Sequence, residues 1–103
     1  RVLDLTDARG DLCGRLLGDL GADVLRIEAP VGAGSRTLPP FGPDGTSLHF
    51  AYRNTNKRSA VLDITTPAGR AELLDLVSRA DVLVESFRPG ALADLGLGPD
   101  VLL

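Results

Sequence analysis

The chain has 103 residues, enough for one small domain with a modest hydrophobic core. Its formal charge of −3 argues against non-specific nucleic-acid binding, and its apolar content of 44% is ordinary for a globular protein. No apolar run in the sequence approaches the length of a membrane span and no signal-peptide pattern is visible, so neither a membrane nor a nucleic-acid partner is expected. The single cysteine, Cys13, excludes an internal disulfide and a multi-cysteine metal site, and we expect no metal and a cytoplasmic location.

The first and last residues both fall inside apolar patterns. Arg1–Thr6 already has the pattern of a buried strand, and the sequence stops at Val101–Leu103 within another apolar run. A complete domain rarely begins and ends inside its own core elements. We therefore expect residues 1–103 to be part of a domain that is truncated at both ends.

The first part of the chain predicts a strand, a helix and a second strand. After Arg1–Thr6, apolar residues at helical spacing predict a helix that starts near Leu12 and stops at Gly21. Its predicted buried face consists of Cys13, Leu16, Leu17 and Leu20. The second strand follows at Asp23–Glu28. Short turns between these elements favour a right-handed crossover and two parallel strands.

The middle of the chain is rich in glycine, proline and charge. Ala29–Gly45 is predicted to be a long loop, which in a compact domain is usually functional or mobile. A short helix within Thr46–Asn54, capped by Thr46 or Ser47, is expected next. Asn54–Ser59 is expected to be a polar, basic loop.

The remaining sequence again alternates strands and helices. A third strand is predicted at Ala60–Ile64, and a helix begins with Thr66 as its N-cap and Pro67 in its first turn. Val82–Val84 is the fourth predicted strand, and two short helices follow, at Ala91–Leu95 and at the end of the chain. The alternation predicts an α/β fold with a mostly parallel sheet.

Glu85–Gly90 directly follows the fourth strand and is the first place to look for function. In open α/β sheets, ligands bind just beyond the carboxyl ends of the strands. Phe87 offers a stacking surface and Arg88 a cation, and an adenine ring and a phosphate would use both. The alternative is that Phe87 fills the core while Arg88 lies in solvent.

Two further segments are candidates for binding an anion. Arg53–Arg58 contains three cations in six residues, and it either holds a phosphate through charge-assisted hydrogen bonds or is a solvated loop. Gly32–Arg36 is either a flexible loop or a loop that closes over an anionic ligand with Arg36 as the counter-ion. Neither this segment nor Gly10, at the first strand–helix junction, has the glycine spacing of a dinucleotide-binding turn.

The sequence contains no catalytic constellation. Cys13 lies on the apolar face of the first helix and is predicted to be a buried structural thiol. His49 has no adjacent nucleophile or carboxylate pattern and is predicted to be a structural or surface residue. Asp7, Asp11 and Asp19 are interpreted as caps and surface charges.

A set of segments in one order carries a resemblance to a known family: Arg1–Thr6, Leu20–Glu28, Asn56–Ser59 with Leu62–Asp63, Thr66–Arg70, and Ala80–Gly90 with Leu95–Gly96. Together they resemble the N-terminal part of the family III CoA-transferases, the CaiB/BaiF family, over nearly the whole chain. That family also includes carnitine–CoA transferases, formyl-CoA transferase and α-methylacyl-CoA racemase.

The resemblance implies a Rossmann-like, three-layer α/β domain with helices on both faces of the sheet, and an interlocked homodimer of the full-length protein. It also implies that this region binds CoA, with acyl-CoA and a carboxylic acid as substrates. The predicted CoA-binding residues, which include the basic pair before the third strand, are Leu62, Asp63, Ile64, Thr65, Ser86, Phe87, Arg88, Lys57 and Arg58.

The function implied by the resemblance is transfer of CoA from an acyl-CoA to a carboxylic acid through an aspartyl anhydride and an aspartyl-CoA thioester. In the family, that aspartate lies downstream of the matched region. We therefore expect no catalytic residue here and an inactive chain in isolation. A 2-methylacyl-CoA racemase shares this N-terminal pattern and is the alternative enzyme. A non-catalytic binding or interaction module is the alternative from another class.

Four positions depart from the family pattern. Ala8–Leu12 replaces a common Ala-Gly-Pro turn, and Ala29 stands where an arginine commonly binds a CoA phosphate. Ser86 replaces an asparagine, and Asp94 replaces an arginine found in some members. Two other arginines are candidates to take over the phosphate contact: Arg26 and Arg36.

Overall fold

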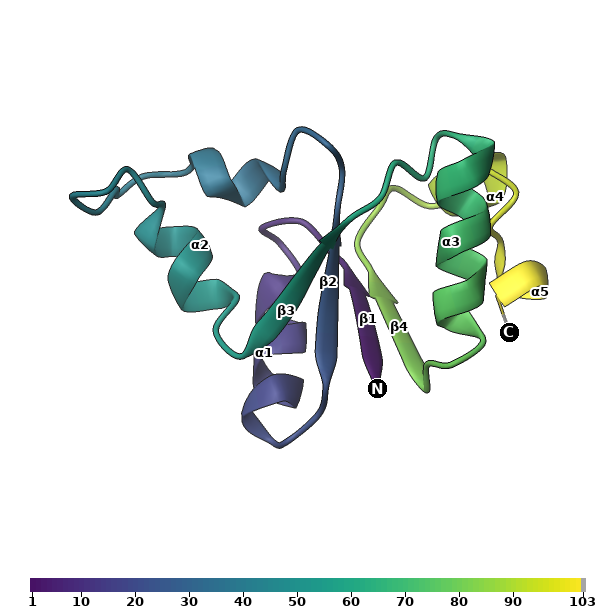
Figure 1. The fold of residues 1–103 in the computed structure, drawn as a ribbon, viewed down its shortest axis with the longest axis horizontal. Coiled ribbons are helices and arrows are strands. Elements are labelled where there is room, and N and C mark those ends of the chain that lie inside the picture. Colours follow the sequence, from purple (N-terminus) through teal and green to yellow (C-terminus); the bar gives the residue numbers. More distant parts are fainter. Residues whose placement is uncertain (103) are drawn as a thin grey trace.

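The computed structural model describes residues 1–102, and within them four strands form one sheet in the order β3-β2-β1-β4 (Figure 1). The strands are β1 (Val2–Leu5), β2 (Val24–Glu28), β3 (Lys57–Val61) and β4 (Val82–Glu85). Each pair of neighbouring strands is parallel. The α/β fold with a parallel sheet that the sequence predicts is confirmed.

The helices lie on both sides of the sheet. They are α1 (Asp11–Asp19), α2 (Leu48–Arg53), α3 (Pro67–Val77), α4 (Ala91–Asp94) and α5 (Pro99–Leu102), with the short 3₁₀ helix η1 (Gly34–Thr37) in the long loop. In Figure 1, α1 and α2 lie to one side of the strands, and α3, α4 and α5 lie to the other. This follows because β1–α1–β2 and β3–α3–β4 cross the sheet in opposite directions, and right-handed crossovers then place their helices on opposite faces. Nowhere in residues 1–102 is a helix long and apolar enough to cross a membrane.

Side-chain caps fix where two helices begin. Ser47 Oγ accepts the backbone N–H of Phe50 at 3.1 Å at the start of α2. Thr66 Oγ1 accepts the N–H of Gly69 at 3.1 Å at the start of α3, just before Pro67. Both caps agree with the prediction from the sequence, since each satisfies a backbone donor that the first helical turn leaves free.

The two faces of the sheet differ in chemistry. The face toward α3 carries the hydrophobic core, formed by Leu3, Leu5, Ile27, Leu73 and Leu97. On the opposite face the buried strand positions include charged residues: Asp4, Arg26 and Glu28. Because buried charges require partners, this second face determines how the surrounding helices and loops are held.

The bounds predicted for the third strand were wrong. β3 runs over Lys57–Val61 rather than Ala60–Ile64, so residues expected in a polar loop begin the strand. They can do so because Lys57 pairs with the buried Asp4 carboxylate and Ser59 donates to the buried Glu28 carboxylate. Hydrophobic periodicity carries no signal for a strand whose inward side chains are polar.

Three of the four α1 residues predicted to be buried are in fact exposed, and the fourth, Leu17, is only partly buried. Cys13 is exposed rather than a structural thiol in the core, and Leu16 and Leu20 are 53% and 86% exposed. The helix buries Asp11 and Gly14 instead. The orientation of α1 follows from the charged face of the sheet beneath it. Asp11, the first residue of α1, forms an ion pair with Arg26 on that face.

Candidate functional site

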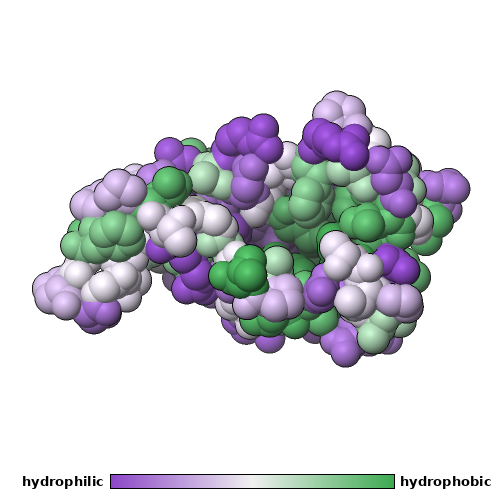
Figure 2. Space-filling view, turned by 90° about the horizontal axis from the view of Figure 1, so that it is seen from above, coloured by the Kyte–Doolittle hydropathy of each residue, from purple (hydrophilic) through white to green (hydrophobic). Residues whose placement is uncertain are grey.

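A cavity of about 450 Å³ lies at the carboxyl edge of the sheet. Residues at or just beyond the ends of all four strands line it, together with Gly32–Gly34 of the long loop. Figure 2 looks onto this edge and shows a hollowed surface between hydrophobic and hydrophilic groups. The connections leave the neighbouring strands β1 and β4 in opposite directions, so the cavity lies at the topological switch point, where open α/β sheets bind ligands.

Seven of the predicted CoA-binding residues line this cavity: Leu62, Asp63, Ile64 and Thr65 after β3, and Ser86, Phe87 and Arg88 after β4. The two segments come together because the carboxyl ends of parallel strands share one edge of the sheet. Phe87 is 40% exposed, so it does not fill the core and part of its ring is open to a ligand. The side chain of Arg88 is 72% exposed.

Both segments have defined local contacts. The hydroxyl and the backbone N–H of Thr65 donate to Asp63 Oδ1, and these hydrogen bonds lower the pKa of the Asp63 carboxyl below its ordinary value. Arg88 Nη2 lies 3.0 Å from Asp94 Oδ2. Asp94 is one of the departures from the family pattern. It is therefore the ion-pair partner of Arg88, the residue predicted to bind a phosphate.

The other two predicted residues do not reach the cavity. Lys57 begins β3 at the opposite edge of the sheet, and its Nζ contacts Asp4 and donates to the backbone oxygen of Asp11 at 2.8 Å. Arg58 pairs with both carboxylate oxygens of Asp23, at 3.0 and 2.8 Å. Both cations are engaged in holding β3 to the surrounding structure, and both lie outside the candidate site.

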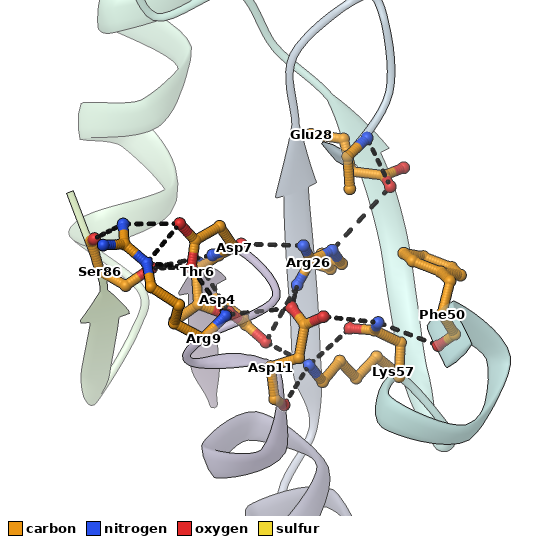
Figure 3. Close-up of polar contacts among 12 residues, drawn as sticks. Asp4, Thr6, Asp7, Arg9, Asp11, Arg26, Glu28, Phe50, Lys57 and Ser86 are labelled. Atoms are coloured by element: carbon orange, nitrogen blue, oxygen red, sulfur yellow. Dashed lines mark hydrogen bonds and ion pairs between the residues drawn. The ribbon is translucent and has the colours of Figure 1, made fainter. Parts of the chain in front are cut away.

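Sequence reasoning missed a cluster that joins the ends of β1 and β4. Arg9 donates from Nε and Nη2 to Asp7 Oδ2 at 2.9 and 2.7 Å (Figure 3). Ser86 Oγ accepts the Asp7 N–H at 2.9 Å and donates to Asp7 Oδ1 at 3.0 Å, while Ser86 O accepts from Arg9 Nη2 at 3.1 Å. The hydrogen bonds from Arg9 are the main reason that the pKa of Asp7 falls to about 2. The close spacing of Asp7 and Arg9 after a strand was the one available signal in the sequence.

A buried arginine ties β2 to the loop that follows β1. Arg26 is 2% exposed, and it donates from Nη1 to Asp11 Oδ1 at 2.7 Å and from Nη2 to Thr6 O at 2.8 Å (Figure 3). Its terminal nitrogens are thus already used inside the protein. Arg26 shapes the floor of the cavity and is not a free substitute for the family's phosphate-binding arginine.

The long loop is fastened by Arg36. Its Nε and Nη2 lie 2.7 and 3.0 Å from the carboxylate oxygens of Glu28, and its guanidinium lies 4.0 Å from the centre of the Phe50 ring. Burial raises the pKa of Glu28, but the hydrogen bonds from Arg36 and Ser59 outweigh it and keep that pKa below its ordinary value. Arg36 therefore holds Gly32–Gly34 at the rim of the cavity and does not line the cavity as a counter-ion.

The groups that line the cavity are suited to binding. They include the ring of Phe87, exposed guanidinium groups, and the apolar side chains Leu62, Ile64 and Leu95. Within residues 1–102, no group of three His, Cys, Asp or Glu side chains is placed to hold a metal ion. A ligand with an aromatic base, anionic groups and an uncharged arm matches this lining.

Fold and cavity together define a doubly wound α/β protein with a ligand site at its switch point. The sequence profile of CoA-transferase family III matches residues 1–103, and the chain belongs to this family. The resemblance carried by the sequence motifs is thereby confirmed.

Relatives of known name cover nearly the whole chain. It is 43% identical over 105 residues to the probable fatty acyl-CoA transferase Rv3272 of Mycobacterium tuberculosis, an alignment that covers 99% of this chain. It is also 43% identical over 107 residues to the succinyl-CoA:mesaconate CoA-transferase of Haloarcula hispanica, again over 99% of this chain. The chain spans 27% of the length of both relatives.

Crystal structures of family members have the same fold. A mutant of Rv3272 superposes with a TM-score of 0.90 at 42% identity, covering 99% of this chain and 28% of that one. A CaiB/BaiF family protein from Brucella suis also superposes with a TM-score of 0.90, at 37% identity over 98% of this chain and 28% of that one.

Proposed function

We propose that the complete protein transfers CoA from an acyl-CoA to a carboxylic acid, and that residues 1–103 form the N-terminal part that holds the CoA. One observation carries this proposal. Two segments that the sequence predicts to bind CoA, Leu62–Thr65 and Ser86–Arg88, leave different strands and line one cavity at the switch point.

The lining fits the parts of a CoA molecule. The exposed ring of Phe87 is a surface on which the adenine can stack, and Arg88 is a cation for a phosphate. The apolar side chains of Leu62 and Ile64 suit the uncharged pantetheine arm. The carboxylates in this lining are Asp7, Glu28 and Asp63. Each is engaged by neighbouring side chains, so this lining binds and orients the thioester. The nucleophilic aspartate of the family's chemistry lies downstream of residues 1–103, as the resemblance implies.

The names of the relatives support transfer over racemisation. Rv3272 is a probable fatty acyl-CoA transferase, and the Haloarcula enzyme moves CoA between succinyl-CoA and mesaconate. A non-catalytic module would also have this fold, and it is distinguished from the enzyme by an exchange assay. Incubating the complete gene product with acyl-CoA donors and a panel of carboxylic acids should yield a new CoA thioester, detected by mass spectrometry.

Calorimetric titration tests the binding half of the proposal. CoA should bind saturably to the complete gene product, and Arg88→Ala should weaken binding about tenfold, the usual effect of losing one charge-assisted hydrogen bond. Arg79→Ala is a matched comparison, because Arg79 is an exposed arginine paired with Asp75 at 2.6 Å that does not line the cavity. If CoA fails to saturate the complete protein, the proposal is wrong.

The complete protein is also proposed to be a homodimer, as the family resemblance implies. The apolar side chains of Leu12, Leu16 and Leu20 are exposed along α1, which supports a surface that is covered in the assembly. Light scattering coupled to size exclusion should give twice the mass of one complete chain.

A further inference from the structure

Two departures from the family pattern touch each other at the switch point. The loop that replaces the common Ala-Gly-Pro turn contains Arg9, and the residue that replaces the family's asparagine is Ser86. They are far apart in the sequence, yet Arg9 Nη2 donates to Ser86 O at 3.1 Å. Asp7, at the start of the same loop, exchanges two hydrogen bonds with the Ser86 hydroxyl. The substituted positions therefore form one structural unit.

Gly10 allows this loop to lie close to the end of β4. A Cβ added at Gly10 would lie 2.8 Å from Thr6 Cγ2 and 3.4 Å from Ser86 Cβ. The first distance is shorter than ordinary van der Waals contact, so a larger residue would push the loop away from Thr6 at the end of β1. The absence of a side chain at this position lets the loop that carries Asp7 and Arg9 pack closely against Thr6, with Ser86 within ordinary contact distance.

The guanidinium of Arg9 is held in one orientation but only partly used. Asp7 accepts hydrogen bonds from Nε and Nη2 of Arg9, and the backbone oxygen of Ser86 accepts another from Nη2. No described residue accepts a hydrogen bond from Nη1. The side chain is 75% exposed and lines the cavity. A fixed planar fork with a free edge is the arrangement by which arginine binds phosphate or carboxylate oxygens.

The other arginines of the cavity differ from Arg9. Arg26 is buried, with Nη1 and Nη2 bonded to Asp11 and Thr6. Arg88 has a single contact with Asp94 and is 72% exposed, so its orientation is less restricted. Arg9 thus lines the cavity, has a guanidinium group held in a fixed plane, and keeps Nη1 available to donate to a ligand.

We infer that Arg9 is a ligand-binding residue of this site that binds an oxyanion of the acyl-CoA, with Asp7 as the residue that positions it. This inference rests on the proposed function. Asp7 reduces the net positive charge near the ligand. It also holds the Arg9 side chain in place before the ligand binds, so less conformational entropy is lost on binding. The oxyanion is either a phosphate of CoA or a carboxylate of the acyl group, since the same fork recognises both.

The test is calorimetric, on the complete gene product, with acetyl-CoA and succinyl-CoA as two probes. Arg9→Ala should weaken binding about tenfold, the effect of losing one hydrogen bond to a charged group. Equal weakening for both probes assigns the contact to a CoA phosphate, and weakening confined to succinyl-CoA assigns it to the acyl carboxylate. If Arg9→Ala binds both probes as tightly as the wild type, the inference is wrong even though CoA binding stands.

Two further variants separate positioning from folding. Asp7→Asn keeps the size of the side chain but loses the ion pair, so it should weaken binding in the same direction as Arg9→Ala, and adding Asp7→Asn to Arg9→Ala should cost little more. Arg79→Ala removes another exposed arginine–aspartate pair, outside the cavity, and should leave both affinities unchanged. Failure of the wild type to bind either probe would refute the proposed function itself, which distinguishes the two claims.

Discussion

Lys57 Nζ lies 2.5 Å from Asp4 Oδ2, and both side chains are almost fully buried, at 1% and 0% exposure. The two residues belong to β3 and β1, which are separated in the sheet by β2, so the lysine reaches across a whole strand. Gly14 of α1 lies directly above them: a Cβ there would be 2.4 Å from Asp4 Oδ2 and 3.0 Å from Lys57 Cε. The face of the sheet toward α1 is therefore held by a buried ion pair beneath a glycine.

Replacing Lys57 by methionine should be strongly destabilising. The variant keeps the length of the side chain but leaves the Asp4 carboxylate buried without its nearest cation, which typically costs about 3–5 kcal/mol. Arg58→Met, at the next position of the same strand, removes an exposed pair with Asp23 and should cost less than about 1 kcal/mol. Urea unfolding of the complete gene product measures both. Equal costs for the two variants would contradict a special role for the buried pair.

Gly69→Ala should also destabilise the protein, for a steric reason. A Cβ at Gly69 would lie 1.8 Å from the backbone oxygen of Asp63, which no side-chain rearrangement can relieve. The start of α3 and the turn after β3 would have to separate, at a cost of about 3 kcal/mol. Gly34→Ala is the matched control. A Cβ at Gly34 would contact nothing within 4 Å and the residue has no positive φ, so the free energy of unfolding should change by less than about 0.5 kcal/mol. Because Asp63 lines the cavity, Gly69→Ala should weaken CoA binding as well, which calorimetry would show.

The parts of the fold that depend on local chemistry could be predicted from the sequence. The caps Ser47 and Thr66 have the expected side-chain bonds, because capping involves residues three apart. The meeting of Leu62–Thr65 with Ser86–Arg88 was also predictable, since strands that alternate with helices are parallel and end at the same edge of a sheet.

The charged face of the sheet and the Arg9 cluster could not be predicted in this way. Hydrophobic patterns identify burial by apolar content, so the burial of Asp4 under Gly14 and the exposure of Cys13 both contradict the pattern. The buried pair depends on strand order and register, which put Lys57 level with Val2, on the same face of the sheet as Asp4. The contact of Arg9 with Ser86 likewise requires the tertiary fold, because no local signal links residues so far apart.

The stabilisation from Asp7 should disappear in acid. Its pKa of about 2 in the folded protein lies below the ordinary value of 3.8, so its contribution is present above pH 4 and is lost as the pH falls through about 2. The stability difference between wild type and Asp7→Asn should thus be constant from pH 7 to about pH 5 and fall to about half near pH 3. Because the Asp7 side chain is 49% exposed, the full difference should stay below about 1 kcal/mol.

Thermal unfolding in buffers between pH 7 and pH 3 measures this difference. In an Arg9→Ala background, Asp7→Asn should show a much smaller pH dependence, because Arg9 is the main cause of the lowered pKa. A difference that stays the same at pH 3 as at pH 6 would show that Asp7 has an ordinary pKa in the folded protein.

Phe87→Ala should weaken CoA binding with little effect on folding. The ring is 40% exposed and lines the cavity, so its removal leaves no large void in the core. Stacking of a base on an aromatic ring contributes about 1–3 kcal/mol, and the dissociation constant for CoA should therefore rise by about tenfold. The same variant should bind 4′-phosphopantetheine, which lacks the adenine, with unchanged affinity. Phe41→Ala removes another exposed ring, 51% exposed and outside this cavity, and should change neither affinity. Equal losses for CoA and 4′-phosphopantetheine would place the adenine elsewhere and restrict Phe87 to shaping the loop after β4.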